Sequence, residues 1–391
     1  MNRRIAADWV FPVSSPPMRR GILELDEQGR ILGLQDTGGV MHDSAGLEYY
    51  NGILIPGFIN CHCHLELSYL RGCFPMHTRL PGFIRNIARH PRPGPEEVQK
   101  AISAADRDLW DAGVQAVGDI SNNSSSFGVK SQSRMRYHTF VETFDLAGGT
   151  TASRLEEARE VLRKAGEQGL EASLVPHAPY TVSAGLMREL AGTGGRKSIH
   201  NQETRSEDQF IRESTGELGD LLKEIGARID PEMHGRSSSP EAMLPFFDAG
   251  TRLLMVHNTF TTGADLEYMK KSGPEISLVL CPNANLYIEN RLPEVELLAG
   301  SGLNICIGTD SLASNNCLSV LDEMKTIACS FPSISFGELL RWASLNGARA
   351  LGMEEELGSF DKGKRPGVLL LEGVDPGKPG LAEKTGIRRI V

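Results

Sequence analysis

The alternation of short β-rich runs with helical segments constrains the fold of this 391-residue chain more than any other feature. The β-rich runs span residues 53–61, 114–120, 136–144, 171–176, 197–200, 252–257, 276–281 and 304–308. Helical patterns lie between them, for example at residues 96–112, 154–168, 207–226, 263–271 and 318–329. An open doubly wound sheet has about five or six strands, so eight strands alternating with helices predict an α/β fold, a (β/α)₈ barrel of the TIM type.

Both ends of the chain lie outside this alternation. Residues 52–355 contain the predicted barrel, which leaves residues 1–51 and 356–391. The N-terminal piece has turn signals such as Asp26-Glu27-Gln28-Gly29-Arg30 between short apolar runs. Because each piece is too small to fold alone, we expect the two to pack together as one small β-sandwich domain.

The segment Asn60-Cys61-His62-Cys63-His64 ends the first β-rich run. Residues two apart on a strand point the same way, so His62 and His64 place two imidazoles on one side. This pattern predicts half of a metal site. Two alternatives are a hydrogen-bonded pair of buried histidines and a structural Cys/His zinc site that uses Cys61 and Cys63, although strand geometry sends those thiols away from the histidines.

Polar residues collect at the predicted carboxyl ends of the barrel strands, where active sites of this fold lie. Five of the ten histidines lie at four strand ends: His62, His64, His177, His200 and His257. The eighth strand ends in Gly308-Thr309-Asp310-Ser311. We interpret the other five, His42, His77, His90, His138 and His234, as ordinary surface or loop residues.

Imidazole nitrogens and a carboxylate oxygen suit one divalent cation, Zn²⁺ or Fe²⁺, which would activate a water molecule as hydroxide. The predicted ligands are His62, His64, His200 and Asp310. Glu203 is predicted to carry protons between water and substrate, with a helix N-terminal carboxylate as the alternative. His257 is predicted to orient or deprotonate the water, and Asp310 to accept a proton from it while remaining bound.

The net charge and the apolar content of the chain limit the kinds of partner that we expect it to bind. The net charge of −9 and pI near 5.7 argue against nucleic acid or an anionic membrane surface. The chain has no apolar run long enough to span a bilayer, and its first ten residues lack the apolar segment of a signal peptide. We therefore expect a cytoplasmic protein with a small-molecule substrate, in which the seven scattered cysteines are reduced.

Together these motifs resemble the amidohydrolase superfamily, over nearly the whole chain. The matching segments are Pro56-Gly57-Phe58-Ile59-Asn60 before His62-Cys63-His64, His177 to Ser183, His200 to Thr204, His257-Asn258, Gly308 to Ser311, and Gly358 to Lys364. The chain is most similar to the branch of deaminases and chlorohydrolases that act on amino-substituted rings. The spacing of His200 and Glu203 resembles that branch, and the absence of a lysine at the end of strand three or four implies a single metal.

Within this branch the chain is most similar to the aminodeoxyfutalosine deaminases of an alternative menaquinone pathway. The similar segments are His62 to Ser68, Gly82-Phe83-Ile84 and Cys281 to Tyr287. The resemblance implies substrate contacts at Glu66, His177, Glu142, Asn285 and Ser311. For Glu66 the alternative is a loop carboxylate paired with Arg71 or Arg85. The segment Gly363 to Val368 departs from the family pattern, which more often has an Ala-Asp pair there.

The resemblance implies a homodimeric, metal-dependent deaminase of a purine-type nucleoside, with 6-amino-6-deoxyfutalosine as the preferred substrate. Hydroxide would attack the amino-bearing ring carbon, and ammonia would leave. The alternatives are another substrate (adenosine, S-adenosylhomocysteine or guanine) and hydrolysis of an amide or a halide. A scaffold that has lost catalysis is disfavoured, because the predicted ligands, Glu203 and His257 are all present.

Overall fold

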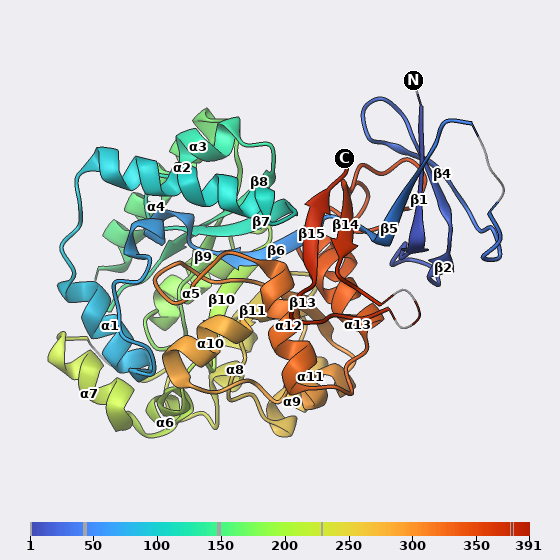
Figure 1. The fold of residues 1–391 in the computed structure, drawn as a ribbon. Helices are drawn as coiled ribbons and strands as arrows, with labels where there is room; N and C mark the ends of the chain where they lie inside the picture. The colour runs from blue at the N-terminus through green and yellow to red at the C-terminus, as the bar shows by residue number, and fades with distance from the viewer. Residues whose placement is uncertain (1, 42–44, 147–149, 228–229, 376, 378) are drawn as a thin grey trace.

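The computed structural model describes the whole chain except residues 1, 42–44, 147–149, 228–229, 376 and 378. His42 therefore lies outside the described residues. The chain forms an α/β body and a sheet built from both of its ends, and Figure 1 shows the blue N-terminal and red C-terminal strands on one side of that body.

The two ends of the chain share one mixed sheet of seven strands in the order β15-β14-β5-β1-β3-β4, with β2 paired to β1. Its strands are β1 (Arg3–Val10), β2 (Met18–Arg19), β3 (Ile22–Leu25), β4 (Ile31–Gln35), β5 (Leu47–Pro56), β14 (Val368–Glu372) and β15 (Gly386–Arg389). The terminal segments thus meet as expected, although hydrogen bonds connect all seven strands into one sheet where a β-sandwich was predicted. Its apolar cluster includes Ile5, Leu23 and Leu370.

Gly57 divides the first predicted barrel strand. The run at residues 53–61 is not one strand, because β5 ends at Pro56 in the terminal sheet and β6 (Phe58–Cys63) begins the barrel. The Gly57 N–H donates to the Pro366 carbonyl at 3.0 Å, and a Cβ at this position would lie 2.2 Å from the Gln115 side chain. Only glycine fits this crossing point. We therefore propose Gly57 as the junction of the two parts.

The barrel strands run in parallel in two groups of four, β6 to β9 and β10 to β13. After β6 they are β7 (Val114–Ser121), β8 (Arg136–Thr143), β9 (Glu171–Pro176), β10 (Lys197–Asn201), β11 (Arg252–His257), β12 (Glu275–Leu280) and β13 (Asn304–Ile307). Hydrogen bonds join the groups at both seams, from the His200 N–H to the His177 carbonyl and from the Thr309 N–H to the His62 carbonyl. This arrangement confirms the predicted (β/α)₈ barrel.

Apolar side chains fill the barrel, among them Ile59, Phe140, Val175 and Leu254. Helices cover its outside and its carboxyl end, the longer ones being α1 (Arg79–Arg89), α2 (Pro95–Asp111), α4 (Thr151–Glu167), α5 (Ala184–Ala191), α6 (Arg205–Glu213), α7 (Gly216–Glu224), α9 (Gly263–Lys271), α10 (Pro282–Glu289) and α12 (Val320–Ser330). Shorter helices are α3 (Phe127–Gln132), α8 (Ser239–Met243), α11 (Val295–Gly300), α13 (Phe336–Arg341) and α14 (Gly347–Ala350).

The expected helix at residues 207–226 is two helices, α6 and α7. Ser214 adopts a left-handed conformation (φ 57°) that ends α6, and Thr215 is extended before α7 begins. A second difference concerns His138, which is buried on β8 and hydrogen-bonded to the Ser173 hydroxyl at 3.0 Å instead of lying on the surface.

All seven cysteines are free thiols, as expected. Across the described part of the chain, no helix has both the length and the apolar character that crossing a membrane requires.

Candidate active site

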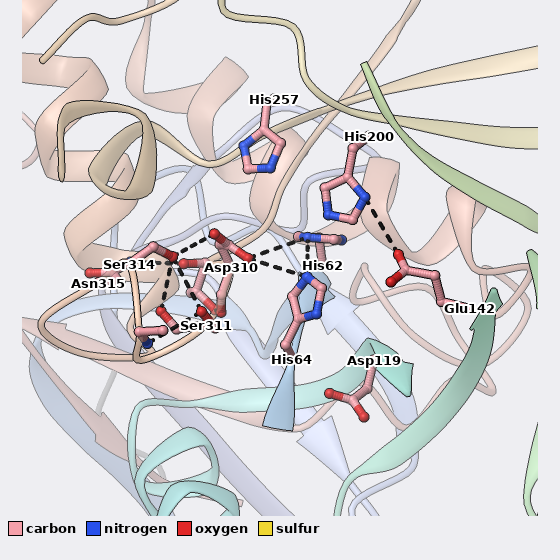
Figure 2. Close-up of polar contacts among 12 residues, drawn as sticks. His62, His64, Asp119, Glu142, His200, His257, Asp310, Ser311, Ser314 and Asn315 are labelled. Carbon is pink, nitrogen blue, oxygen red and sulfur yellow. Dashed lines mark hydrogen bonds and ion pairs between the residues drawn. The ribbon is translucent and has the colours of Figure 1, made fainter. Parts of the chain in front are cut away.

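Three histidines and one aspartate converge at the carboxyl end of the barrel (Figure 2). The Nε2 atoms of His62 and His64 lie 3.1 Å apart. Asp310 Oδ1 lies 3.5 Å from Nε2 of His62 and 3.4 Å from Nε2 of His64. The ring of His200 lies 5.0 Å from that of His62, between centroids. The structure therefore brings together the four residues that the sequence singled out as ligands.

The ionisation of these groups suits a cation. Burial, and then the charge of His62, lower the pKa of His64 to about 3, and burial lowers the pKa of His200 well below its usual range. Both imidazoles are therefore neutral near pH 7 and offer lone pairs. Although burial alone would raise it, hydrogen bonding to His62 brings the pKa of Asp310 below its usual range, so this carboxylate is ionised. Neutral imidazoles with a carboxylate form a fitting ligand set for Zn²⁺ or Fe²⁺.

Two backbone features place the aspartate against the histidines. The N–H groups of Thr309 and Asp310 both donate to the His62 carbonyl at 3.0 Å. Gly308 allows this approach, because a Cβ there would lie 2.7 Å from the His62 Cβ. The Ser314 hydroxyl donates to Asp310 Oδ2 at 2.5 Å and so fixes the carboxylate. Ser311 lies in the same loop, where its hydroxyl contacts Ser314 at 3.3 Å (Figure 2).

Glu203 and His257 form a pair beside the ligands, with Glu203 Oε1 3.7 Å from His257 Nε2. The amide oxygen of Asn285 accepts a hydrogen bond from His257 Nδ1 at 2.9 Å. This bond leaves Nε2 with a lone pair that faces Glu203. Burial lowers the pKa of His257, and burial followed by the charge of Asp310 raises the pKa of Glu203 well above its usual range. The pair thus combines a neutral base with a carboxyl group able to carry a proton near neutral pH.

His177 and Glu142 lie on the other side of His200. The Thr181 hydroxyl donates to the Ala178 carbonyl at 3.0 Å and accepts from His177 Nδ1 at 2.8 Å, which leaves His177 Nε2 as an acceptor. Glu142 Oε1 is buried without a hydrogen-bond partner and lies 3.5 Å from His200 Nδ1. That nitrogen already donates to the His177 carbonyl at 2.9 Å, so the Glu142 oxygen remains open.

Asn122, which the sequence analysis missed, connects Glu142 with Glu66. Its side-chain amide donates to Glu142 Oε2 at 3.1 Å, and its backbone N–H donates to Glu66 Oε1 at 3.0 Å. The Asn123 N–H reaches the second Glu66 oxygen at 3.3 Å. Burial raises the pKa of both glutamates to about 7. Asn122 follows β7 directly, so its place after a barrel strand could have revealed it.

The alternative partners of Glu66 do not contact it. Arg71 pairs with Asp108, and Arg85 pairs with Glu224.

A buried ion pair below the ligands was also missed. Asp119 on β7 and Lys130 on α3 have fully buried side chains in contact with each other. Asp119 Oδ1 accepts the N–H of Leu65 at 2.7 Å, directly after His64. Lys130 also donates to the hydroxyls of Ser121 at 2.8 Å and Thr139 at 3.3 Å. The sequence signal for this ion pair was Asp119, a charged residue within the apolar run at residues 114–120.

The cysteines next to the histidines do not form a structural zinc site. Cys61 packs inside the barrel, whereas Cys63 belongs to the larger apolar cluster outside it. Within the described residues, the groups able to hold a metal are built from histidine and carboxylate side chains only.

Comparison with known proteins gives a family match over most of the chain. A sequence model of the amidohydrolase family matches residues 53–388. This range includes all four predicted ligands together with Glu203 and His257.

Among curated proteins, an adenosine deaminase of Helicobacter pylori is 26% identical over 328 residues, which cover 81% of this chain and 78% of that protein. An aminodeoxyfutalosine deaminase of Deinococcus radiodurans is 26% identical over 347 residues, or 85% and 81% of the two chains. The crystal structure of Helicobacter pylori aminofutalosine deaminase in complex with methylthio-coformycin superposes with a TM-score of 0.80 at 21% identity, and the alignment covers 100% of both chains. This structural likeness shows that the fold is shared.

Proposed function

Because this chain belongs to the amidohydrolase family, we propose that it is a metal-dependent deaminase of amino-substituted purine nucleosides. The observation that carries the proposal is the Glu203–His257 pair beside four convergent ligand atoms. One side of the site can hold a cation and the other can move protons. Activation of water by a cation and proton transfer by nearby side chains together support hydrolytic deamination.

The cation would be held by His62, His64, His200 and Asp310. When bound, it would lower the pKa of a coordinated water molecule toward neutrality. Zn²⁺ is the cation we propose, with Fe²⁺ as the alternative for the same ligands.

Residues of the chain then carry out the proton transfers. His257 Nε2 has a lone pair held in place by Asn285, so it can orient the attacking water or accept its proton. Glu203 can pass a proton to the departing nitrogen, because its raised pKa lets it carry one near neutral pH. The ring C–O bond forms, the C–N bond breaks, and protonated nitrogen leaves as ammonia.

Substrate binding is assigned to the opposite side of His200. His177 Nε2 and Glu142 Oε1 are both unfilled acceptor positions there. Acceptors of this kind match the hydroxyl donors of a ribose. Glu66, whose oxygens already accept two backbone N–H groups, holds Asn122 next to Glu142. Asn285 acts through His257, and Ser311 completes the loop that follows Asp310.

The preferred substrate is 6-amino-6-deoxyfutalosine, which would place the protein in menaquinone biosynthesis. Support comes from the similarity to the Deinococcus radiodurans protein and to the Helicobacter pylori structure, and the segments quoted above agree. Adenosine is the main competitor, because the Helicobacter pylori adenosine deaminase is equally similar in sequence.

The test is ammonia release by the purified, zinc-loaded protein. Aminodeoxyfutalosine, adenosine, S-adenosylhomocysteine, guanine and cytosine are compared by kcat/KM, with Glu203→Gln as the inactive control. We expect a preference of at least about tenfold for one purine nucleoside. If the loaded protein releases no ammonia from any of the five, the proposal fails, and amide or halide hydrolysis becomes the leading alternative.

A further inference from the structure

The loops that carry Glu203 and His257 both pass through left-handed backbone. Gln202 (φ 47°), His257 (φ 77°) and Asn258 (φ 54°) all have positive φ although none is glycine. Such conformations are unfavourable for residues with a Cβ and persist only where the surroundings enforce them. The two loops must therefore be held by other contacts.

The side chain of Gln202 joins these loops. It is fully buried, and its Oε1 accepts a hydrogen bond from the Thr261 hydroxyl at 2.6 Å, four residues after His257. Its Nε2 donates to Asp265 Oδ2 at 3.1 Å, in the first turn of α9. The backbone carbonyl of Gln202 accepts the Phe260 N–H at 3.1 Å. The residue before Glu203 is thus tied at three points to the segment after His257.

Glu207 fixes the same turn from the other side. Its carboxylate is fully buried in the first turn of α6. It accepts the N–H of Gln202 at 2.8 Å and the N–H of Glu203 at 3.1 Å. Two consecutive amides bound by one carboxylate set the direction in which the Glu203 side chain leaves the backbone.

We infer that Gln202 and Glu207 are positioning residues that set the distance between Glu203 and His257. The inference rests on the proposed function, since it concerns proton transfer between these two groups. It extends that function beyond the groups that touch substrate. The 3.7 Å separation of Glu203 Oε1 and His257 Nε2 is the quantity that the two residues control.

Substrates with different leaving groups can distinguish a positioning role of Gln202 and Glu207 from a role in folding stability alone. The departing amino group must receive a proton to leave as ammonia when the C–N bond breaks, whereas chloride leaves a 6-chloropurine nucleoside without one. A displaced Glu203 therefore slows the amino substrate more than the chloro substrate. A variant that only folds less well loses the same factor on both.

The experiment uses Glu207→Gln, which keeps the shape of the side chain but replaces one acceptor with an NH₂ group facing a backbone N–H. Ammonia release from the purine nucleoside that the wild type prefers and chloride release from its 6-chloro analogue are measured together with metal content. Glu213→Gln is the matched control, because Glu213 is an exposed carboxylate on the same helix that pairs with its neighbour Arg212. Thr261→Val, which removes one hydroxyl from the opposite loop, is the second variant if Glu207→Gln does not fold.

We expect kcat for the amino nucleoside to fall by about 10- to 100-fold in Glu207→Gln while the metal content stays full, because general acid–base contributions are of about this size. The loss of kcat for the chloro substrate should be less than a third of that factor. Thr261→Val should also slow the amino substrate more than the chloro substrate, with smaller losses of kcat. Glu213→Gln should have the wild-type kcat for both substrates. Equal losses on both substrates, or no loss, would overturn the inference. Absence of ammonia release by wild type from all five compounds of the deaminase test would instead remove the proposed function on which it rests.

Discussion

Replacing Lys130 with Met should destabilise the protein strongly, although Lys130 touches no ligand of the predicted metal site. Its ammonium group is buried against Asp119 and is also hydrogen-bonded to two hydroxyls. Removing one partner of a buried ion pair costs about 3–5 kcal/mol, and the hydroxyls that lose their donor add about 1 kcal/mol. We therefore expect the free energy of unfolding to fall by about 4–6 kcal/mol, measured by urea titration of chelated protein at pH 8.

The loss should depend on pH, because it arises from an uncompensated carboxylate. Burial already raises the pKa of Asp119, and removal of Lys130 would raise it further. Protonated Asp119 needs no counter-charge, so the deficit of the variant should shrink as the pH falls from 8 to 5. Asp119 also binds the N–H of Leu65 after His64. Zinc affinity should therefore fall by about tenfold, as measured by competition with a chelator.

Asp119→Asn combined with Lys130→Met is the matched control, because an amide can still accept the Leu65 N–H without carrying a charge. The double variant should recover at least about half of the lost stability, since it contains no unpaired buried charge. A single variant within about 1 kcal/mol of wild type at pH 8 would refute the reasoning.

The remaining predictions concern three acidic residues. Glu203→Gln should lower kcat by at least about 100-fold while metal content stays near one ion per chain, because a proton carrier and not a ligand is lost; loss of metal would reject the assigned role. Asp310→Asn should impair both zinc retention and turnover, checked by metal analysis after dialysis, and a fully active variant would overturn the site. Glu323 is buried in the first turn of α12, and burial raises its pKa from 4.5 to about 8. Its ionisation should therefore lower stability as the pH rises from about 5 through 8, by up to a few kcal/mol. Glu323→Gln should therefore show a shallower decline of unfolding free energy over that range, and an unchanged slope would contradict this assignment.

The sequence predicted the barrel strands and the convergence of the ligands because both depend on local patterns. Short β-rich runs mark each strand, and the topology of the barrel brings the carboxyl ends of all its strands together. His62, His200 and Asp310 therefore meet even though more than a hundred residues separate each from the next. Their contact could therefore be predicted without knowing how side chains pack.

Features that depend on contacts between distant segments were not predictable in this way. The break at Gly57 depends on Gln115 and Pro366, which come close only in the folded chain. The pairing of Lys130 with Asp119 and the link from Asn122 to Glu142 arise from side-chain packing between neighbouring elements. A single sequence shows these residues but does not show which of their many possible partners they meet.

The terminal sheet also has a consequence for biosynthesis. Strand β5 pairs on one side with β1, which is made early, and on the other with β14, which ends at Glu372. The edge of β5 that faces β14 consequently stays without its partner until β14 has left the ribosome. An apolar strand with an open edge can pair with other chains, so the nascent protein is exposed to aggregation throughout elongation. Closure of this edge therefore comes after synthesis of the barrel, and slowing the synthesis of the segment that carries β14 would lengthen the vulnerable period without changing a single residue of the barrel.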